Sequence, residues 1–285
     1  ETVVGKKDAT ENEVGYTGDK VCSVCNKVTE KGKEIPKLGV SLATPVVTVK
    51  NSATGVKVTW KAIDGATSYK VYRKTYSTKT KKWGSWKTCG TVTTTSYVDT
   101  KAKSGTKYIY TVKALNGDVK SGIKSSSTIL YLAQPTVKIA NASTGVKVSW
   151  NKVTGATGYT VYRSEYKNGA WTKWASRGTA KANKTSWTDT KVASGVQYKY
   201  TVRAVNGKLR SGFKATAGLM KLAEPVVKIA NASKGVKVAW SKVTGATGYT
   251  VYRSEYVNGS WSKWKNMGTA KNTQTSWVDK SAVSG

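Results

Sequence analysis

Apolar and polar residues alternate with a period of two along most of this chain. Val146, Val148 and Trp150 alternate with polar neighbours, and residues 159–163 and 198–204 follow the same pattern. Successive side chains of a β-strand point to opposite faces, so each segment predicts a strand with one buried face. We find no amphipathic helical run, and the pattern therefore predicts an all-β protein.

Asn-Gly pairs separate several of these predicted strands. Both residue types tolerate the positive φ that a type I′ hairpin turn requires. The pairs lie at residues 116–117, 168–169, 206–207 and 258–259. They predict hairpins with two-residue loops.

The pattern repeats every 90 residues. Residues 135–195 and 225–285 align without a gap and are identical at 43 of 61 positions. An earlier copy is more diverged, with Trp83 and Trp86 two residues later than the spacing predicts. The markers that recur are Pro45, Pro135 and Pro225; Gly55, Gly145 and Gly235; Trp60, Trp150 and Trp240; Tyr69, Tyr159 and Tyr249. Self-similarity of this kind indicates three copies of one structural unit.

The repeats resemble fibronectin type III domains. The resemblance is carried by Trp150, by Tyr-Thr-Val-Tyr-Arg at 159–163 and by Ser-Gly-Val-Gln-Tyr-Lys-Tyr-Thr-Val-Arg-Ala at 194–204. It implies an immunoglobulin-like β-sandwich of about seven strands, in tandem as beads on a string. It also implies a tyrosine corner, in which the hydroxyl of Tyr198, or Tyr108 in the first repeat, bonds to the backbone. The sequence of residues 155–163 is similar to that of modules that Firmicutes bacteria append to secreted and surface proteins.

Four segments follow from the repeat and the resemblance. We expect a small hairpin segment at 1–40 and fibronectin type III-like repeats at 41–132, 133–222 and 223–285. The third repeat is expected to be truncated before its last two strands, F and G, as part of a longer protein.

Residues 1–40 contain the pair Cys22 and Cys25 and resemble a second bacterial surface repeat. In that family a His usually follows the position of Gly39, where this chain has Val40. Two thiolates are half of a tetrahedral zinc site, and the chain has no His. We therefore expect a local disulfide or free thiols rather than a metal.

The residue types needed for catalysis are scarce. No His is present to activate a Ser or Cys nucleophile. Cys89 aligns with Arg177 and Met267, so the unit does not depend on a thiol there. Asp99, Asp189 and Asp279 occupy one repeated position, which indicates a structural role. We expect no enzyme activity and no cofactor.

Charge indicates the class of partner. The formal net charge is +33, and all of the excess lies after residue 40. Such a field favours anionic polysaccharide or cell-wall polymer, although a solvated lysine coat explains it equally well. Nucleic acid is disfavoured because the basic residues are spread over many strands and turns. No stretch is apolar enough to predict a membrane span.

Aromatic residues are the binding candidates, since the chain has 11 Trp and 16 Tyr. If Tyr159 and Val161 point inward, Tyr162 points outward beside Lys199, Thr201 and Arg203. Rings there could stack on a sugar or receive a partner's side chain, or they could be covered by Lys and Arg stems. Trp171 and Trp261 are expected in the core. The candidates are Tyr72, Tyr162, Trp174, Arg203, Tyr252 and Trp264.

Three functions remain open, all extracellular and either secreted or attached to the cell surface. The first is a non-catalytic spacer or adhesion array that contacts anionic glycans or wall polymer. The second is recognition of a specific protein, such as a host immunoglobulin or another surface protein. The third is an accessory module of a glycan- or wall-degrading enzyme. Fold alone does not separate them.

Overall fold

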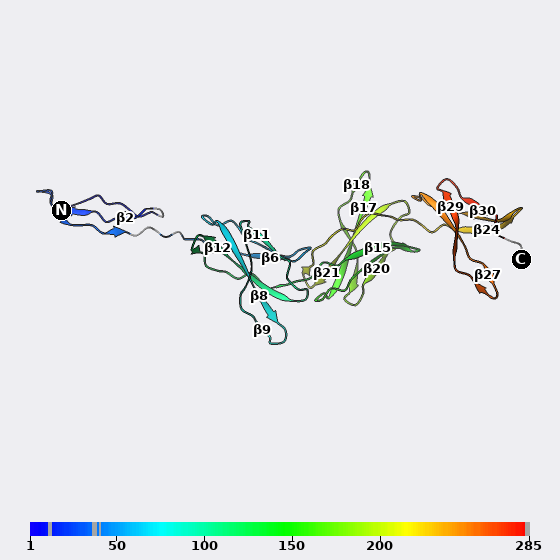
Figure 1. The fold of residues 1–285 in the computed structure, drawn as a ribbon, viewed down its shortest axis with the longest axis horizontal. Coiled ribbons are helices and arrows are strands. Elements are labelled where there is room, and N and C mark those ends of the chain that lie inside the picture. The colour runs from blue at the N-terminus through cyan, green and yellow to red at the C-terminus, as the bar shows by residue number, and fades with distance from the viewer. Residues whose placement is uncertain (11–12, 36–38, 40, 283–285) are drawn as a thin grey trace. The chain divides into compact units, whose positions relative to one another are not determined.

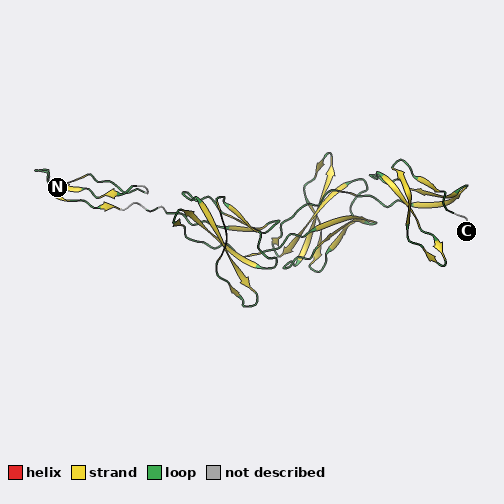
Figure 2. Ribbon diagram, in the orientation of Figure 1, coloured by secondary structure: helices red, strands yellow, loops and turns green. Residues whose placement is uncertain are grey.

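The computed structural model of the chain describes residues 1–10, 13–35, 39 and 41–282. Every regular element in these ranges is a β-strand (Figure 2), which confirms the all-β prediction. Contacts divide the chain into two compact units. One holds the N-terminal segment and most of the first repeat, and the other holds residues 51–55, 103–105 and the chain from 130 onward. Val40 and residues 283–285 lie outside the described residues.

The N-terminal segment forms two small antiparallel sheets. β3 pairs with both β1 and β4, and β2 pairs with β5 (Figure 1). Cys22 and Cys25 lie in the turn between β3 and β4, where the Asn26 amide donates to the Cys22 carbonyl at 2.9 Å. The strands are β1 Thr2–Val4, β2 Gly15–Tyr16, β3 Asp19–Val21, β4 Val28–Glu30 and β5 Glu34–Ile35.

The first repeat has two antiparallel sheets. The smaller has the order β11-β7-β6, and in the larger β8 lies between β10 and β12. The smaller contains β6 Thr48–Asn51, β7 Val56–Thr59 and β11 Ser96–Asp99; the larger contains β8 Ser68–Ser77, β9 Lys82–Trp83, β10 Lys87–Val92, β12 Lys107–Asn116, β13 Val119–Lys120 and β14 Ile129–Leu130.

The second repeat has the same two-sheet arrangement. One sheet has the order β15-β16-β20, and in the other β17 lies between β19 and β21. The first contains β15 Val137–Ala142, β16 Gly145–Trp150 and β20 Ser186–Asp189; the second contains β17 Gly158–Lys167, β18 Ala170–Trp171, β19 Ala175–Lys181, β21 Gln197–Asn206, β22 Leu209–Arg210 and β23 Leu219–Met220.

The core of the second repeat lies between its sheets, as the alternation predicts. Val148 and Val202 are fully buried, and the rings of Trp150 and Tyr159 meet at 5.3 Å between centroids. The Ala193 amide donates to the Tyr198 hydroxyl at 2.9 Å, the backbone bond expected of a tyrosine corner. Interdigitating side chains from both sheets therefore close the sandwich.

A buried ion pair joins the two sheets. The guanidinium of Arg163 on β17 donates to the carboxylate of Asp189 on β20 at 2.8 Å, and the Tyr200 hydroxyl donates to the same oxygen at 3.0 Å. Burial, together with the charge of Asp189, raises the pKa of Tyr200. Arg73, Asp99 and Tyr110 repeat the arrangement in the first repeat, and Arg253 and Asp279 repeat the pair in the third. The recurring aspartate thus has the structural role predicted for it.

The third repeat contains the first part of the same pattern. β25 pairs with β24 and β30, β26 with β29, and β27 with β28. No counterpart of β21 or β23 occurs among the described residues of this repeat. The strands are β24 Val227–Ala232, β25 Gly235–Trp240, β26 Gly248–Arg253, β27 Tyr256–Val257, β28 Ser260–Trp261, β29 Lys265–Lys271 and β30 Ser276–Asp279.

Two predictions about the hairpins need correction. Trp171 is only half-buried and Trp261 is 70% exposed, so neither ring lies in the core. Each packs instead on a tyrosine of its own hairpin, at 5.3 Å between ring centroids. Trp171 lies on β18 and Trp261 on β28, and among the described residues each of these strands pairs only with the strand that carries its tyrosine.

The Asn-Gly turns are also of two kinds. Asn168 and Gly169 both have positive φ, at 50° and 79°, as a type I′ turn requires. At Asn206-Gly207 only the glycine does, because Asn206 is the last residue of β21 and pairs with Leu209. The Asn206 side chain instead donates to the Gly155 carbonyl at 2.8 Å.

No helix in the described part of the chain has the length and apolar character that a membrane crossing needs.

Candidate binding site

Three of the predicted binding residues meet in the second repeat. Tyr162, Trp174 and Arg203 line one pocket of about 200 Å³, together with Thr201 and Phe213. The sequence placed Thr201 beside Tyr162, but it did not identify Phe213. Phe213 is the chain's single Phe, and that rarity is the one feature that could have drawn attention to it.

The strand register places the floor of the pocket. Tyr162 on β17 pairs with Thr201 on β21, and Arg203 lies two residues further along β21. These side chains leave the sheet on the face opposite Val161 and Val202, which point into the core. The alternation that directs valines into the core therefore also directs Tyr162, Thr201 and Arg203 to the outer face.

Two loop segments supply the walls. Trp174 lies just before β19, which pairs with β17 through a bulge at Val161/Tyr162. Phe213 lies in the segment between β22 and β23, which is attached to β21 at both ends. The Ala204 amide donates to the Ser211 hydroxyl at 3.0 Å, and the Tyr200 amide donates to the Thr216 hydroxyl at 3.1 Å. These bonds fix the loop that carries Phe213.

The rings and the guanidinium hold one another in place. The Arg203 guanidinium lies over the Phe213 ring at 4.9 Å from its centroid. Trp174 meets Phe213 edge-on at 6.2 Å and 70°. Stacking of a guanidinium on an aromatic face is favourable and leaves the N–H groups, which lie in the plane of the guanidinium, available to other partners. The pocket is therefore pre-organised.

Two polar atoms at this site lack partners. The Thr201 hydroxyl oxygen and the Arg203 Nε are both buried, and neither makes a hydrogen bond within the described residues. Thr201 is only 2% exposed. A buried donor or acceptor without a partner is costly and uncommon. The pocket thus contains hydrogen-bonding capacity that the described chain does not use.

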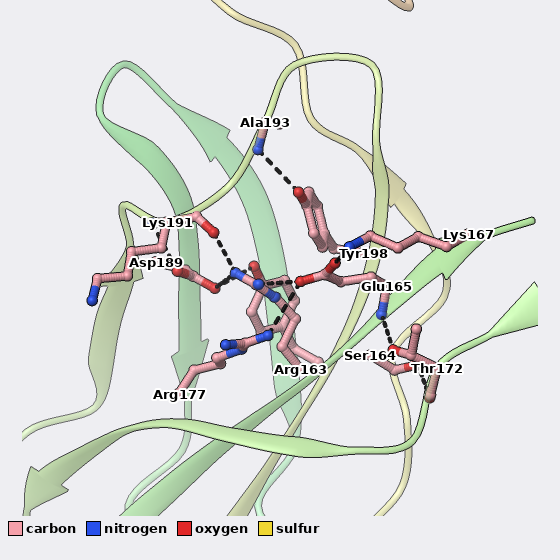
Figure 3. Close-up of polar contacts among 11 residues, drawn as sticks. Arg163, Ser164, Glu165, Lys167, Thr172, Arg177, Asp189, Lys191, Ala193 and Tyr198 are labelled. Atoms are coloured by element: carbon pink, nitrogen blue, oxygen red, sulfur yellow. Dashed lines mark hydrogen bonds and ion pairs between the residues drawn. The ribbon is translucent and has the colours of Figure 1, made fainter.

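A separate ionic cluster lies on β17 and β19 of the same repeat (Figure 3). Glu165 binds Arg163, Lys167 at 2.9 Å and Arg177 at 3.2 Å. The hydrogen bond from Lys167, together with the one from Arg163, holds the pKa of Glu165 below its usual value. Because these ion pairs hold the carboxylate in its charged form, the cluster stabilises the sandwich.

The predicted candidate of the first repeat has a different environment. Tyr72 lies near the Nζ of Lys70, 5.7 Å from the ring centroid. Trp86, the counterpart of Trp174, lies beneath the Nζ of Lys74 at 4.9 Å. Thr111, the counterpart of Thr201, donates to the Lys124 carbonyl at 2.9 Å. Here the rings have the lysine-covered arrangement.

The candidates of the third repeat do not form a pocket of this kind. Tyr252 is 54% exposed and Trp264 is 72% exposed. Tyr252 lines a smaller pocket of about 110 Å³ with Trp240 and Tyr249, and Trp264 is not among the lining residues of that pocket. The two candidates therefore do not come together as Tyr162 and Trp174 do.

The cysteines are not gathered with other metal ligands. No group of three or more His, Cys, Asp or Glu side chains suited to a metal occurs in the described ranges. Backbone hydrogen bonds from Val24 and Cys25 hold the pKa of the Cys22 thiol below its usual value. Burial raises the pKa of Cys89 to about 12. Cys22 and Cys89 therefore differ in reactivity, because the thiolate is the reactive form.

Comparison with known proteins finds a family match within the first repeat. Residues 45–129 match the family described as fibronectin type III domain, SaeA third domain. Exoglucanase B of Cellulomonas fimi is 29% identical over 190 residues, which is 59% of this chain and 15% of that protein. An amylopullulanase of Thermoanaerobacterium saccharolyticum is 38% identical over 73 residues, 25% of this chain and 5% of the relative.

Two further similarities extend the comparison. A poly(3-hydroxybutyrate) depolymerase of Ralstonia pickettii is 34% identical over 115 residues, 39% of this chain and 20% of the relative. The chain thus spans no more than a fifth of any of these three relatives. A solved two-domain fibronectin type III segment of chicken tenascin has a TM-score of 0.33 at 17% identity and covers 64% of this chain and 100% of that segment. With one repeat matched to the family and its pattern recurring every 90 residues, the chain is a tandem of fibronectin type III-like β-sandwiches.

Proposed function

We propose that this chain is a non-catalytic, extracellular accessory segment of a larger protein that acts on or adheres to polysaccharide. The similarity to exoglucanase B carries the proposal, because 190 aligned residues amount to only 15% of that protein. Sandwiches of this type are a minor part of a polymer-degrading relative. In this chain they would space a distal domain from its anchor or substrate.

The charge supports a second part of the same proposal, contact with anionic glycan or wall polymer. The net charge of +33 lies in the repeats, and a field of that sign concentrates polyanions near the surface. Such contact is screened by salt, with a Debye length of about 8 Å at physiological ionic strength. We therefore expect retention that weakens as salt rises.

Co-sedimentation tests the proposal directly. Residues 1–285 are mixed with purified bacterial wall, mucin-coated beads and heparin beads at low and at physiological salt, and release of soluble sugar is measured in parallel. We expect retention at low salt and no sugar release.

Two chemically modified samples provide the control. Acetylation of lysine removes its charge, whereas methylation keeps it. Acetylated chain should lose retention and methylated chain should keep it. Sugar release by the chain alone would contradict the non-catalytic role. Absence of retention at low salt would contradict contact with anionic polymer and leave the spacer role as the only one proposed.

A further inference from the structure

The pocket of the second repeat offers more than a general basic surface. Its lining consists of Tyr162, Trp174, Thr201, Arg203 and Phe213. Three of these side chains are aromatic, one is a guanidinium and one is a hydroxyl. A ligand that satisfies all of them needs an apolar face for the rings, a polar edge for the hydroxyl and negative charge for the guanidinium.

Size limits the ligand to one ring. The volume of about 200 Å³ is below the roughly 300 Å³ at which pockets for drug-sized ligands begin. A continuous polysaccharide chain would not fit inside it. One sugar ring, either terminal or a side branch of a polymer, would.

Charge makes Arg203 the selective group. The carboxylates of this repeat are engaged elsewhere: Asp189 pairs with Arg163, and Glu165 pairs with Arg163, Lys167 and Arg177. In the described part of the chain, Arg203 therefore has no carboxylate partner. Its guanidinium matches the planar geometry of a carboxylate.

The hydroxyl of Thr201 supplies a second polar contact. Its oxygen is buried without a partner, although the residue lines the pocket. Rotation about the Cα–Cβ bond can move the hydroxyl into the position that the methyl group holds, so the hydroxyl can face a ligand. A sugar hydroxyl can both donate to it and accept from it.

We infer that this pocket binds a single pyranose ring that carries a carboxylate, a sugar of the uronic acid class. The apolar face of the ring stacks on Trp174 in the wall and Tyr162 in the floor of the pocket, and the carboxylate accepts from Arg203. The inference deepens the proposed function and rests on it, since it names the chemistry of the anionic glycan. It assigns the selective contact to the second repeat alone.

Two sugars that differ at one carbon test this inference. The full chain 1–285, labelled with ¹⁵N, is titrated with methyl β-D-glucuronide and with methyl β-D-glucoside while the Trp indole N–H resonances are followed. We expect the Trp174 resonance to shift with the glucuronide, and at least about fivefold weaker binding of the glucoside, because charge-assisted hydrogen bonds are the stronger ones. Equal affinity for the two sugars, or no shift with either, would overturn the inference.

Matched variants locate the site. Arg203→Gln keeps a polar side chain but removes the charge, and it should lower glucuronide affinity about tenfold. It should lower glucoside affinity by a smaller factor, because loss of the stacking on Phe213 affects both sugars. Trp174→Ala should abolish binding of both sugars. Trp86→Ala, the matched change in the first repeat, should alter neither. Thermal unfolding of each variant shows whether the sandwich persists, and Arg203→Gln, on a half-buried side chain, is the variant expected to fold as the parent does.

Two further outcomes separate this inference from its alternatives. If an acetylated dipeptide ending in Phe with a free carboxylate binds this site more tightly than the glucuronide, the pocket recognises protein and the sugar assignment is wrong. If the chain binds glucuronide but is not retained on wall, mucin or heparin, the proposed function fails while the pocket stands. If the chain is retained on wall, mucin or heparin but does not bind glucuronide, the proposed function stands and the assignment of the pocket fails.

Discussion

The first and second repeats share a sandwich and differ on its outer face. Both place a tyrosine at one outward position of the central strand, Tyr72 and Tyr162, opposite a threonine of the next strand. In the first repeat Lys74 covers Trp86, and the hydroxyl of Thr111 is bonded. In the second, Ser164 replaces that lysine, and the Thr201 hydroxyl has no partner in the described structure. The comparison shows that a few outward substitutions can open a pocket without changing the core.

The largest expected difference concerns the buried ion pair. Asp189→Ala removes one of the two carboxylates that pair with the Arg163 guanidinium, which is 5% exposed, and it leaves the buried Tyr200 hydroxyl without its acceptor. The substitution should lower the free energy of unfolding of the second repeat by about 3 to 5 kcal/mol. Asp99→Ala should cost less, because Arg73 is 21% exposed and water can solvate it. Hydrogen exchange of peptides from each repeat measures both.

Exposed Asp118 provides the control for this pair of variants. Asp118→Ala should leave protection from exchange unchanged in both repeats. Equal losses for Asp99→Ala and Asp189→Ala would contradict the role of burial in the comparison.

A smaller difference is expected at the paired threonines. Thr111→Val leaves the Lys124 carbonyl without its hydroxyl donor and should destabilise the first repeat by about 1 kcal/mol. Thr201→Val removes an unpartnered buried hydroxyl and should be neutral or stabilising. Hydrogen exchange of peptides from each repeat, measured as the temperature is raised, shows the effect of each variant on the stability of its own repeat. A loss of stability in Thr201→Val equal to that in Thr111→Val would show that the Thr201 hydroxyl is bonded in solution.

A smaller difference in stability is expected from the hairpin loops of the first and second repeats. Lys81 in the first repeat has a φ of 57°, whereas the corresponding hairpin of the second repeat uses Asn168 and Gly169. A left-handed conformation is costly for a residue with a Cβ, although glycine loses more entropy on folding. Lys81→Gly should therefore stabilise the first repeat by about 0.5 kcal/mol, measured by denaturant unfolding. Exposed Lys79→Gly is the control and should give no gain.

The last prediction concerns reactivity rather than stability. At pH 8, iodoacetamide should modify Cys22 and spare Cys89, because the pKa of Cys22 is lowered and that of Cys89 is raised to about 12. Peptide mass spectrometry measures the extent at each site. Raising the pH toward 12 should bring Cys89 into reaction. Rapid modification of Cys89 at pH 8 would mean that this part of the first repeat opens.

The core could be predicted from sequence because alternation reports directly on burial. Tyr159, Val161 and Arg163 are all buried on the predicted face. The partner of Arg163 could not be identified in this way, since Asp189 lies 26 residues away on the facing sheet. That pairing depends on how two sheets are superposed, which no local pattern encodes.

The candidate site was predictable only in part. Tyr162 and Arg203 follow from strand geometry, because their outward direction is fixed by their inward neighbours. Phe213 comes from an irregular segment whose position depends on hydrogen bonds that the Ser211 and Thr216 hydroxyls accept from amides of β21. The expectation that Trp171 lies in the core was wrong for a related reason, since alternation within a strand does not show what packs over its side chains.

The ion pair between Arg163 and Asp189 also bears on how such a chain can evolve. Both partners, with Tyr200, fall inside one 90-residue period, so a duplication of that period copies the whole cross-link at once. Unequal recombination between copies can then lengthen or shorten the array without leaving an orphaned buried charge. Outer faces are free to diverge after each duplication, and new specificities can arise in one copy while its siblings keep the original surface.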